Sequence, residues 1–160
     1  MRNTKIPVAV RKALADGNIR KANAFLRDIY SLRGIVVQGQ QLGRVLGFPT
    51  ANLKLSQEYP LYLANGIYAV KVTLDTITYN GMANIGIRPT LDHHELTIEV
   101  NIFEFDRDIY GRELVVHFID RIRDEKKFNT LEELKEQIAK DKILITGILF
   151  AGMHSDSHTQ

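Results

Sequence analysis

The chain has 160 residues, of which 44% are hydrophobic and 25% charged, and its formal net charge is +2. These values are typical of one soluble globular domain, with or without a small additional segment. The absence of cysteine excludes disulfides, thiolate metal sites and cysteine nucleophiles. No apolar run approaches the roughly 20 residues that span a bilayer, and no signal-peptide stretch follows Met1, so we expect a cytoplasmic protein.

The basic residues are concentrated near the N-terminus. Residues 1–34 contain eight Lys and Arg against Asp16 and Asp28, whereas the rest of the chain is net acidic. This asymmetry is compatible with nucleic-acid contact through the N-terminal segment. A solvated helix face is the simpler interpretation, because no aromatic residues interleave the charges as a base-stacking surface requires.

The first thirty residues predict two short helices. Pro7 suits a first helical position and Gly17 a helix end, and a second helix is expected over 19–26. The apolar face of the second helix carries Ala22, Phe25 and Leu26. We expect residues 1–31 to form a helical appendage to the domain that follows.

Alternating and β-branched segments then predict short strands, at 34–38, 66–74, 78–84, 95–105 and 114–120. The strand 95–105 alternates most clearly, with apolar residues from Leu96 to Ile102 on one face and Glu99 on the other. The connections are too short for the crossover helices of a parallel sheet. The pattern therefore favours a closed antiparallel barrel.

A helix is predicted to follow the strands. Thr130 and Glu133 have the spacing of a capping box. The expected buried stripe of this helix consists of Leu131, Leu134, Ile138 and Ile145. Residues 151–160 are expected to be a disordered polar tail. His154 and His158 in this tail have the helical spacing of a metal pair, although a frayed end is the simpler interpretation.

The segment 39–52 is the most informative for chemistry. Its glycines, Gly39 and Gly47 among them, let backbone amides approach an anion; Arg44 adds a cation, and Thr50 with Asn52 offers oxygen ligands for magnesium. The Gly-Lys-Ser/Thr of a Walker loop is missing. Taken alone, these residues favour a glycine-rich corner of the barrel over a phosphate site.

The segment from Gly43 to Leu53, with its core Pro49-Thr50-Ala51-Asn52, resembles the signature of riboflavin kinases. The resemblance spans Leu32 to about Leu149 with its spacing intact, through segments 66–70, 84–90, 98–100, 105–111 and 121–128. Residues 1–30 are similar to the end of the adenylyltransferase module of bacterial bifunctional FAD synthetases. Since the rest of that module is absent from the sequence, we expect a kinase domain at 32–150 that does not make FAD. It is either a piece of a longer protein or a single-function relative.

The resemblance implies a six-stranded antiparallel Greek-key barrel with a C-terminal α-helix. It also implies transfer of the γ-phosphate of ATP to the ribityl 5′-hydroxyl of riboflavin, giving FMN and ADP. By the same resemblance Thr50 and Asn52 hold Mg²⁺ and Glu99 is the catalytic base. The ATP-binding residues would be Gly39, Arg44, Gly47, Pro49, Thr50, Asn52 and Tyr110. The flavin-binding residues would be Arg123, Glu125, Lys126 and Phe128.

Several alternatives stay open at this point. Phe128 is equally well explained as a core residue before the last helix. Gln38 and Asn101 depart from the family pattern. The family commonly has His or Arg at the position of Gln38 and His at the position of Asn101. These departures bear on affinity and rate. A catalytically weak flavin- or RNA-binding regulatory module is the alternative function. A module that docks on an adenylyltransferase partner through Ala22, Phe25 and Leu26 is a third.

Overall fold

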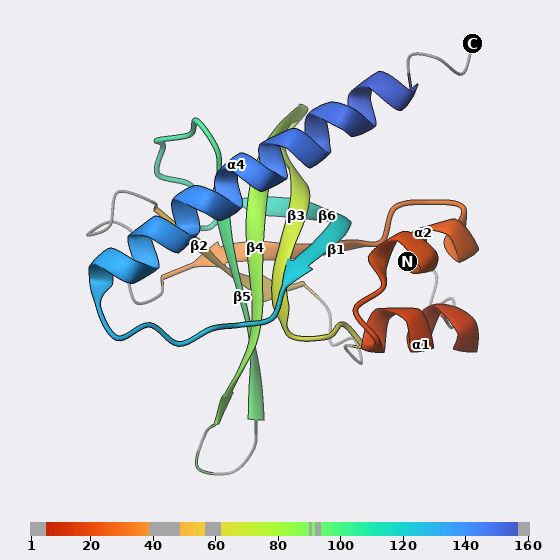
Figure 1. Ribbon diagram of the computed structural model, residues 1–160, viewed down its shortest axis with the longest axis horizontal. Coiled ribbons are helices and arrows are strands. Elements are labelled where there is room, and N and C mark those ends of the chain that lie inside the picture. The colour runs from red at the N-terminus through yellow and green to blue at the C-terminus, as the bar shows by residue number, and fades with distance from the viewer. Residues whose placement is uncertain (1–5, 39–48, 57–61, 90, 92–93, 157–160) are drawn as a thin grey trace.

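The structure is a computed structural model that describes residues 6–38, 49–56, 62–89, 91 and 94–156. Six strands in these residues form a closed barrel in the order β1-β2-β5-β4-β3-β6, and all neighbouring strands are antiparallel (Figure 1). The strands are β1 (Ser31–Val37), β2 (Ala51–Leu55), β3 (Gly66–Leu74), β4 (Ile77–Pro89), β5 (His94–Ile102) and β6 (Glu113–Arg123). Because β3, β4 and β5 are successive neighbours and β6 returns to lie beside β3, the topology is a Greek key, as the resemblance implied.

The β4–β5 hairpin differs in length from the prediction. The two strands pair from Gly81–Ile102 to Pro89–His94, well beyond the Asn84 expected to end the earlier strand. The prediction that the later strand reaches Phe105 is wrong, because the chain turns after Ile102. Glu104 in this turn has a φ of 54°, a left-handed conformation that ends regular pairing.

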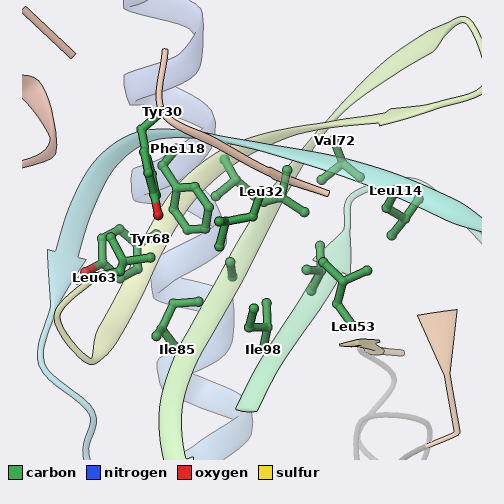
Figure 2. Packing of buried hydrophobic residues seen from close by; sticks show 14 of the residues in the cluster. Tyr30, Leu32, Leu53, Leu63, Tyr68, Val72, Ile85, Ile98, Leu114 and Phe118 are labelled. Atoms are coloured by element: carbon green, nitrogen blue, oxygen red, sulfur yellow. The ribbon is translucent and has the colours of Figure 1, made fainter. Parts of the chain in front are cut away.

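The barrel interior holds the main hydrophobic core. On β1 every second side chain is buried, which places Leu32 and Val36 inside. Phe118 packs edge-on against Tyr68, with ring centroids 5.4 Å apart, and against Tyr30 at 5.9 Å (Figure 2). Residues from all six strands join this cluster, so the interior is filled with side chains.

Helices α1 (Val8–Ala15) and α2 (Ile19–Leu26) pack onto the barrel. Val10, Leu14 and Ile19 are buried in the same cluster as the barrel interior. The expectation of an exposed association face on α2 is wrong for two of its three residues. Ala22 is completely buried and Leu26 packs against the core, whereas Phe25 is exposed. The physical reason is that α2 turns its apolar face toward β6.

Helix α4 (Leu131–Asp156) crosses the outer face of β3 and β4 (Figure 1). Its N-terminus has the predicted capping box: the Glu133 amide donates to Thr130 Oγ1 at 3.1 Å, and the Asn129 amide donates to the Glu133 carboxylate at 3.1 Å. Ile145 and Leu149 are buried in a second cluster, against Ile67, Ala69, Met82 and Phe103.

Two predictions about this helix are wrong. Leu131 is half-exposed and does not belong to the buried stripe, because the first turn lies before the helix reaches β3 and β4. The helix also continues to Asp156, since no proline interrupts residues 151–156 that were assigned to the tail. Residues 157–160, with His158, lie outside the described residues. No helix in the described part of the chain is both long and apolar enough to cross a membrane.

Candidate active site

Three polar residues lie side by side on one rung of the sheet. Asn52 of β2 pairs with Glu99 of β5, which in turn pairs with Asn84 of β4. Directly opposed residues project from the same face, with Cβ atoms about 4.5–5.5 Å apart. The residues next to them along each strand are buried in the barrel: Leu53, Ala83, Ile85, Ile98 and Val100. Because successive side chains of a strand point to opposite faces, the rung faces outward.

The register of β2 places Asn52 next to Glu99. Between β2 and β5 the structure pairs Ala51 with Val100 and Asn52 with Glu99. Leu53 is buried inside the barrel, and a slip of one residue would turn it outward and Asn52 inward. Thr50 immediately precedes β2 and is partly buried. The expected metal ligands and the expected base therefore come together at this seam.

Asn101 fixes the segment that carries Thr50. It lies on β5 with its residue only 6% exposed, and its side-chain Nδ2 donates to the Pro49 carbonyl at 2.7 Å. This hydrogen bond joins the residue before Thr50 to the strand that carries Glu99. Sequence reasoning treated Asn101 only as a departure from the family pattern. Its burial under Pro49 could not be read from the alternation, which predicts an exposed polar position.

A cleft of about 680 Å³ is lined by Ala51 and Val100, the strand neighbours of Asn52 and Glu99, whereas the rung residues themselves are not part of its lining. Pro49, Thr50 and Ala51 line one side of it, and the segment 103–110 lines another. Tyr110 lies in a turn closed by Gly111, whose φ is 79° and whose amide donates to the Val36 carbonyl at 2.9 Å. Three predicted ATP-binding residues, Pro49, Thr50 and Tyr110, thus share one cleft. Gly39, Arg44 and Gly47 lie outside the described residues.

Two cations that the sequence analysis missed line the same cleft. The Arg107 guanidinium lies 4.9 Å from the Phe105 ring centroid and donates to Tyr79 Oη at 3.3 Å. The Lys142 ammonium forms an ion pair with Glu104 at 3.0 Å. Arg107 belongs to one of the segments that carry the resemblance, whereas Lys142 comes from α4. Glu104, Asp106 and Asp108 line the cleft as well, so its wall carries charges of both signs.

The segment between β6 and α4 carries the predicted flavin-binding residues. It crosses the barrel on the side of β4 (Figure 1). Glu125 reaches Gly86 of β4: a Cβ at Gly86 would lie 2.6 Å from the Glu125 carboxylate and 3.1 Å from Thr97 Oγ1. A side chain at this position would displace Glu125. In the same segment the Lys126 ammonium lies 5.7 Å from the centroid of the partly buried Phe128 ring.

Arg123 is bound to α4 rather than directed at the rung. Its Nη2 donates to the Asp141 carboxylate at 2.7 Å, and its Nε donates to both carboxylate oxygens at 3.1 Å. The Asp141 side chain is 3% exposed and also accepts from Gln137 Nε2 at 2.9 Å. The predicted flavin contact of Arg123 stays a prediction, because this arrangement explains the residue without a ligand.

The donor set at the rung fits magnesium. Mg²⁺ prefers hard oxygen ligands, keeps several waters and takes one or two protein ligands beside substrate phosphates. The Thr50 hydroxyl and the Asn52 amide oxygen are such ligands, at the edge of the cleft. Across the described residues no group of three His, Asp or Glu side chains could hold a metal ion.

Comparisons with known proteins agree with this geometry. Residues 26–149 match the family model Flavokinase, described as riboflavin kinase. The chain is 43% identical over 136 residues to the bifunctional riboflavin kinase/FMN adenylyltransferase of Bacillus subtilis (strain 168), which covers 83% of this chain and 43% of that protein. The Escherichia coli (strain K12) protein of the same name is 42% identical over 136 residues, covering 84% of this chain and 43% of its own length. The chain belongs to the riboflavin kinase family.

Two solved structures are also similar. One, titled as a macrolide-efflux protein from Streptococcus pneumoniae, has a TM-score of 0.83 and 38% sequence identity, and covers 91% of this chain and 48% of its own. The riboflavin kinase from Trypanosoma brucei has a TM-score of 0.55 and 29% identity, covering 74% of this chain and 78% of its own. The chain spans less than half the length of the two bacterial relatives named above.

Proposed function

We propose that the chain transfers the γ-phosphate of ATP to the 5′-hydroxyl of riboflavin, giving FMN and ADP. The observation that carries this proposal is the pairing of Asn52 with Glu99 in a chain of the riboflavin kinase family. It sets a carboxylate beside an oxygen ligand for magnesium, at the edge of a cleft that holds Thr50. A phosphotransferase with an alcohol acceptor needs these groups together.

The cleft supplies the nucleotide side of the proposed reaction. Pro49, Thr50 and Tyr110 line it, and Arg107 adds a guanidinium that suits phosphate. Thr50 and Asn52 would hold Mg²⁺, which neutralises charge on the phosphates when it is bound. Arg44 and the glycines at 39 and 47 are proposed to line the same phosphates.

Glu99 is the proposed general base. Its carboxylate accepts the proton of the ribityl 5′-hydroxyl as that oxygen forms a bond to the γ-phosphorus. The bond between the γ-phosphorus and the bridging oxygen breaks, and ADP leaves with the electron pair. Phosphoryl transfer requires mainly positioning and charge neutralisation. The barrel contributes the positioning, because its neighbouring strands hold Asn52 and Glu99 side by side.

The segment 124–128 is proposed to hold the flavin ring. Glu125 lies on Gly86, two residues along β4 from the rung, which sets this segment beside the base. Phe128 provides an aromatic face and Lys126 a cation. Arg123 would act through Asp141, by fixing the start of the segment to α4.

The proposed partner is an adenylyltransferase module. The bacterial relatives are named as both riboflavin kinase and FMN adenylyltransferase, and this chain matches 43% of their length. An RNA-binding role gains no support. Of the basic residues that motivated it, Arg20 forms an ion pair with Asp120 at 2.9 Å and Arg33 with Glu113 at 2.6 Å.

The test is incubation of the purified chain with riboflavin, ATP and Mg²⁺, followed by chromatographic separation of the flavins. We expect FMN and no FAD. Riboflavin that is bound but not converted would contradict the kinase proposal and favour the regulatory alternative. An absence of flavin binding would contradict both.

A further inference from the structure

Asn84 occupies the middle of the outer face of β4, between two covered positions. On one side Met82 packs beneath α4 with Ile145 and Leu149. On the other side Gly86 lies under the Glu125 carboxylate. Between them Asn84 is directly opposite Glu99. A ligand that lies against Glu99 on this face of the sheet is therefore beside Asn84 as well.

The side-chain oxygen of Asn84 is a buried hydrogen-bond acceptor. Asn84 Oδ1 is buried and has no hydrogen-bond partner among the residues that the structure describes. A buried acceptor without a donor is costly, and native structures rarely keep one without a reason. An amide oxygen accepts a hydrogen bond or coordinates a cation, so the missing group is a donor or a metal ion. The oxygens of ionised phosphates are acceptors and cannot fill this role, whereas an alcohol hydroxyl can.

We infer that Asn84 binds the polyol chain of the acceptor substrate, its Oδ1 accepting a hydrogen bond from a ribityl hydroxyl. This inference rests on the proposed function. A polyol carries hydroxyls on successive carbons, so a chain that presents its terminal hydroxyl to Glu99 presents another to the side chain beside it. Asn84 is then a substrate-positioning residue that orients the alcohol for proton transfer, and it recognises the chain rather than the flavin ring.

The test compares two flavins that differ only in this chain. Riboflavin and lumiflavin, which has the ring system with a methyl group in place of the ribityl chain, are titrated by fluorescence in the presence of Mg²⁺ and ADP. We expect Asn84→Ala to weaken riboflavin binding by roughly fivefold to tenfold, the effect of one lost neutral hydrogen bond, and to leave lumiflavin binding unchanged. The KM for riboflavin should rise while the KM for ATP stays close to that of the wild type.

Asn80→Ala is the matched control. Asn80 is the same residue type on the same strand and face, but it is exposed and lies away from the rung. Its removal should change neither titration. If Asn84→Ala does not fold, Asn84→Ser is measured in its place, with the ratio of riboflavin to lumiflavin affinity as the readout. That ratio should fall.

Three results would overturn the inference. Equal loss of riboflavin and lumiflavin affinity would indicate a ring contact or a general structural defect. If excess Mg²⁺ restores riboflavin binding by Asn84→Ala, Asn84 is a metal ligand instead. If the wild-type chain forms FMN and Asn84→Ala binds both flavins as tightly as the wild type does, the role of Asn84 is contradicted but the proposed function is not. A wild-type chain that forms no FMN would contradict the proposed function on which the role rests.

Discussion

Asn101 connects the strand of the proposed base, Glu99, to the residue before the proposed metal ligand Thr50 through its side-chain hydrogen bond. Its amide donates to the carbonyl of Pro49, so Asn101→Ala removes a hydrogen bond at a position that is only 6% exposed. We expect this substitution to lower the free energy of unfolding by about 0.5–1.5 kcal/mol. We also expect it to raise the Mg²⁺ concentration needed for half-maximal rate, because Thr50 loses its anchor. Urea unfolding and a Mg²⁺ titration of FMN formation measure the two effects.

A histidine at this position separates the two effects of the Asn101 substitution. Asn101→His keeps a ring N–H that can donate to Pro49, so its Mg²⁺ requirement should lie closer to that of the wild type. If Asn101→Ala lowers stability but leaves the Mg²⁺ requirement unchanged, Asn101 is a structural residue only.

Sequence reasoning predicted the position of some candidate site residues and missed the contacts of others, and the misses have one physical reason. Asn52 and Glu99 were assigned by the family resemblance, and the alternation of 95–105 placed Glu99 on the face where the structure has it. Asn101 and Arg123 make their main contacts with residues remote in sequence, Pro49 and Asp141. Such pairings depend on which elements pack together, which alternation does not specify.

At the scale of elements, the contact between β6 and α4 depends on the Arg123–Asp141 pair. Replacing Arg123 by Leu leaves the Asp141 carboxylate buried without its cation, which typically costs about 3–5 kcal/mol. We expect the double variant Arg123→Leu/Asp141→Leu to recover most of this loss, because no uncompensated charge remains. Urea unfolding of the two single variants and the double variant measures the coupling.

Riboflavin binding by the same double variant tests the predicted flavin contact of Arg123. If stability recovers and riboflavin affinity also recovers, Arg123 acts through α4. Recovered stability with lost affinity would instead support a direct contact between Arg123 and the flavin.

His117 makes the contact between β1, β6 and β3 sensitive to pH. Its Nδ1 lies 2.7 Å from Ser31 Oγ and its Nε2 lies 2.9 Å from Thr73 Oγ1. Burial lowers the pKa of His117 below its ordinary value of 6.5, with Asp28 opposing this shift and Lys71 adding to it. The unfolded chain therefore binds a proton more readily than the folded chain. Stability conferred by neutral His117 is present above about pH 6.5 and is lost as the pH falls toward the folded pKa.

The variant His117→Gln should make the melting temperature less dependent on pH. Thermal unfolding at about pH 7.5 and about pH 5.5 should give a smaller difference for the variant than for the wild type, because the other titrating groups act equally in both. An identical difference in both proteins would show that the protonation of His117 is not coupled to folding.

The elements were predicted well where their signals are local. The capping box of α4 and the strand at 66–74 depend on signals from neighbouring residues, and the structure confirms both elements. The predicted alternation holds only toward the end of β3, because α4 also covers Ile67 and Ala69 on its outer face. Burial along α4 depends on where the helix crosses the barrel, so Leu131 was misassigned although it has the spacing of the stripe. The extended β4–β5 hairpin depends on pairing between two strands and was underestimated for the same reason.

For the whole molecule, the N-terminal helices belong to the core of the barrel. The match to the family begins at residue 26, yet Val10, Leu14 and Ile19 are buried with the barrel interior. Asn23 also joins α2 to the barrel, donating to the Phe118 carbonyl at 2.9 Å and accepting from the Tyr30 amide at 2.8 Å. Composition and charge suggested an appendage because they do not reveal which surface a helix covers.

Removing residues 1–28 should therefore destabilise the kinase domain. Each large apolar side chain that loses its burial contributes about 1.5–3 kcal/mol, so several such losses approach the whole stability of a small domain. We expect a large fall in melting temperature, measured by circular dichroism. An unchanged melting temperature would show that the helices are dispensable for the fold.

The most direct test of the account follows the phosphoryl group itself. The wild-type chain and Glu99→Gln are incubated with ATP labelled at the γ-phosphate, Mg²⁺ and riboflavin, and the label in FMN is measured. We expect labelled FMN from the wild type and a rate lower by about 10²–10⁴ in Glu99→Gln, with riboflavin binding retained. Labelled FMN formed at the wild-type rate by Glu99→Gln, or no labelled FMN from the wild type, would contradict the assignment of this rung as the site of phosphoryl transfer.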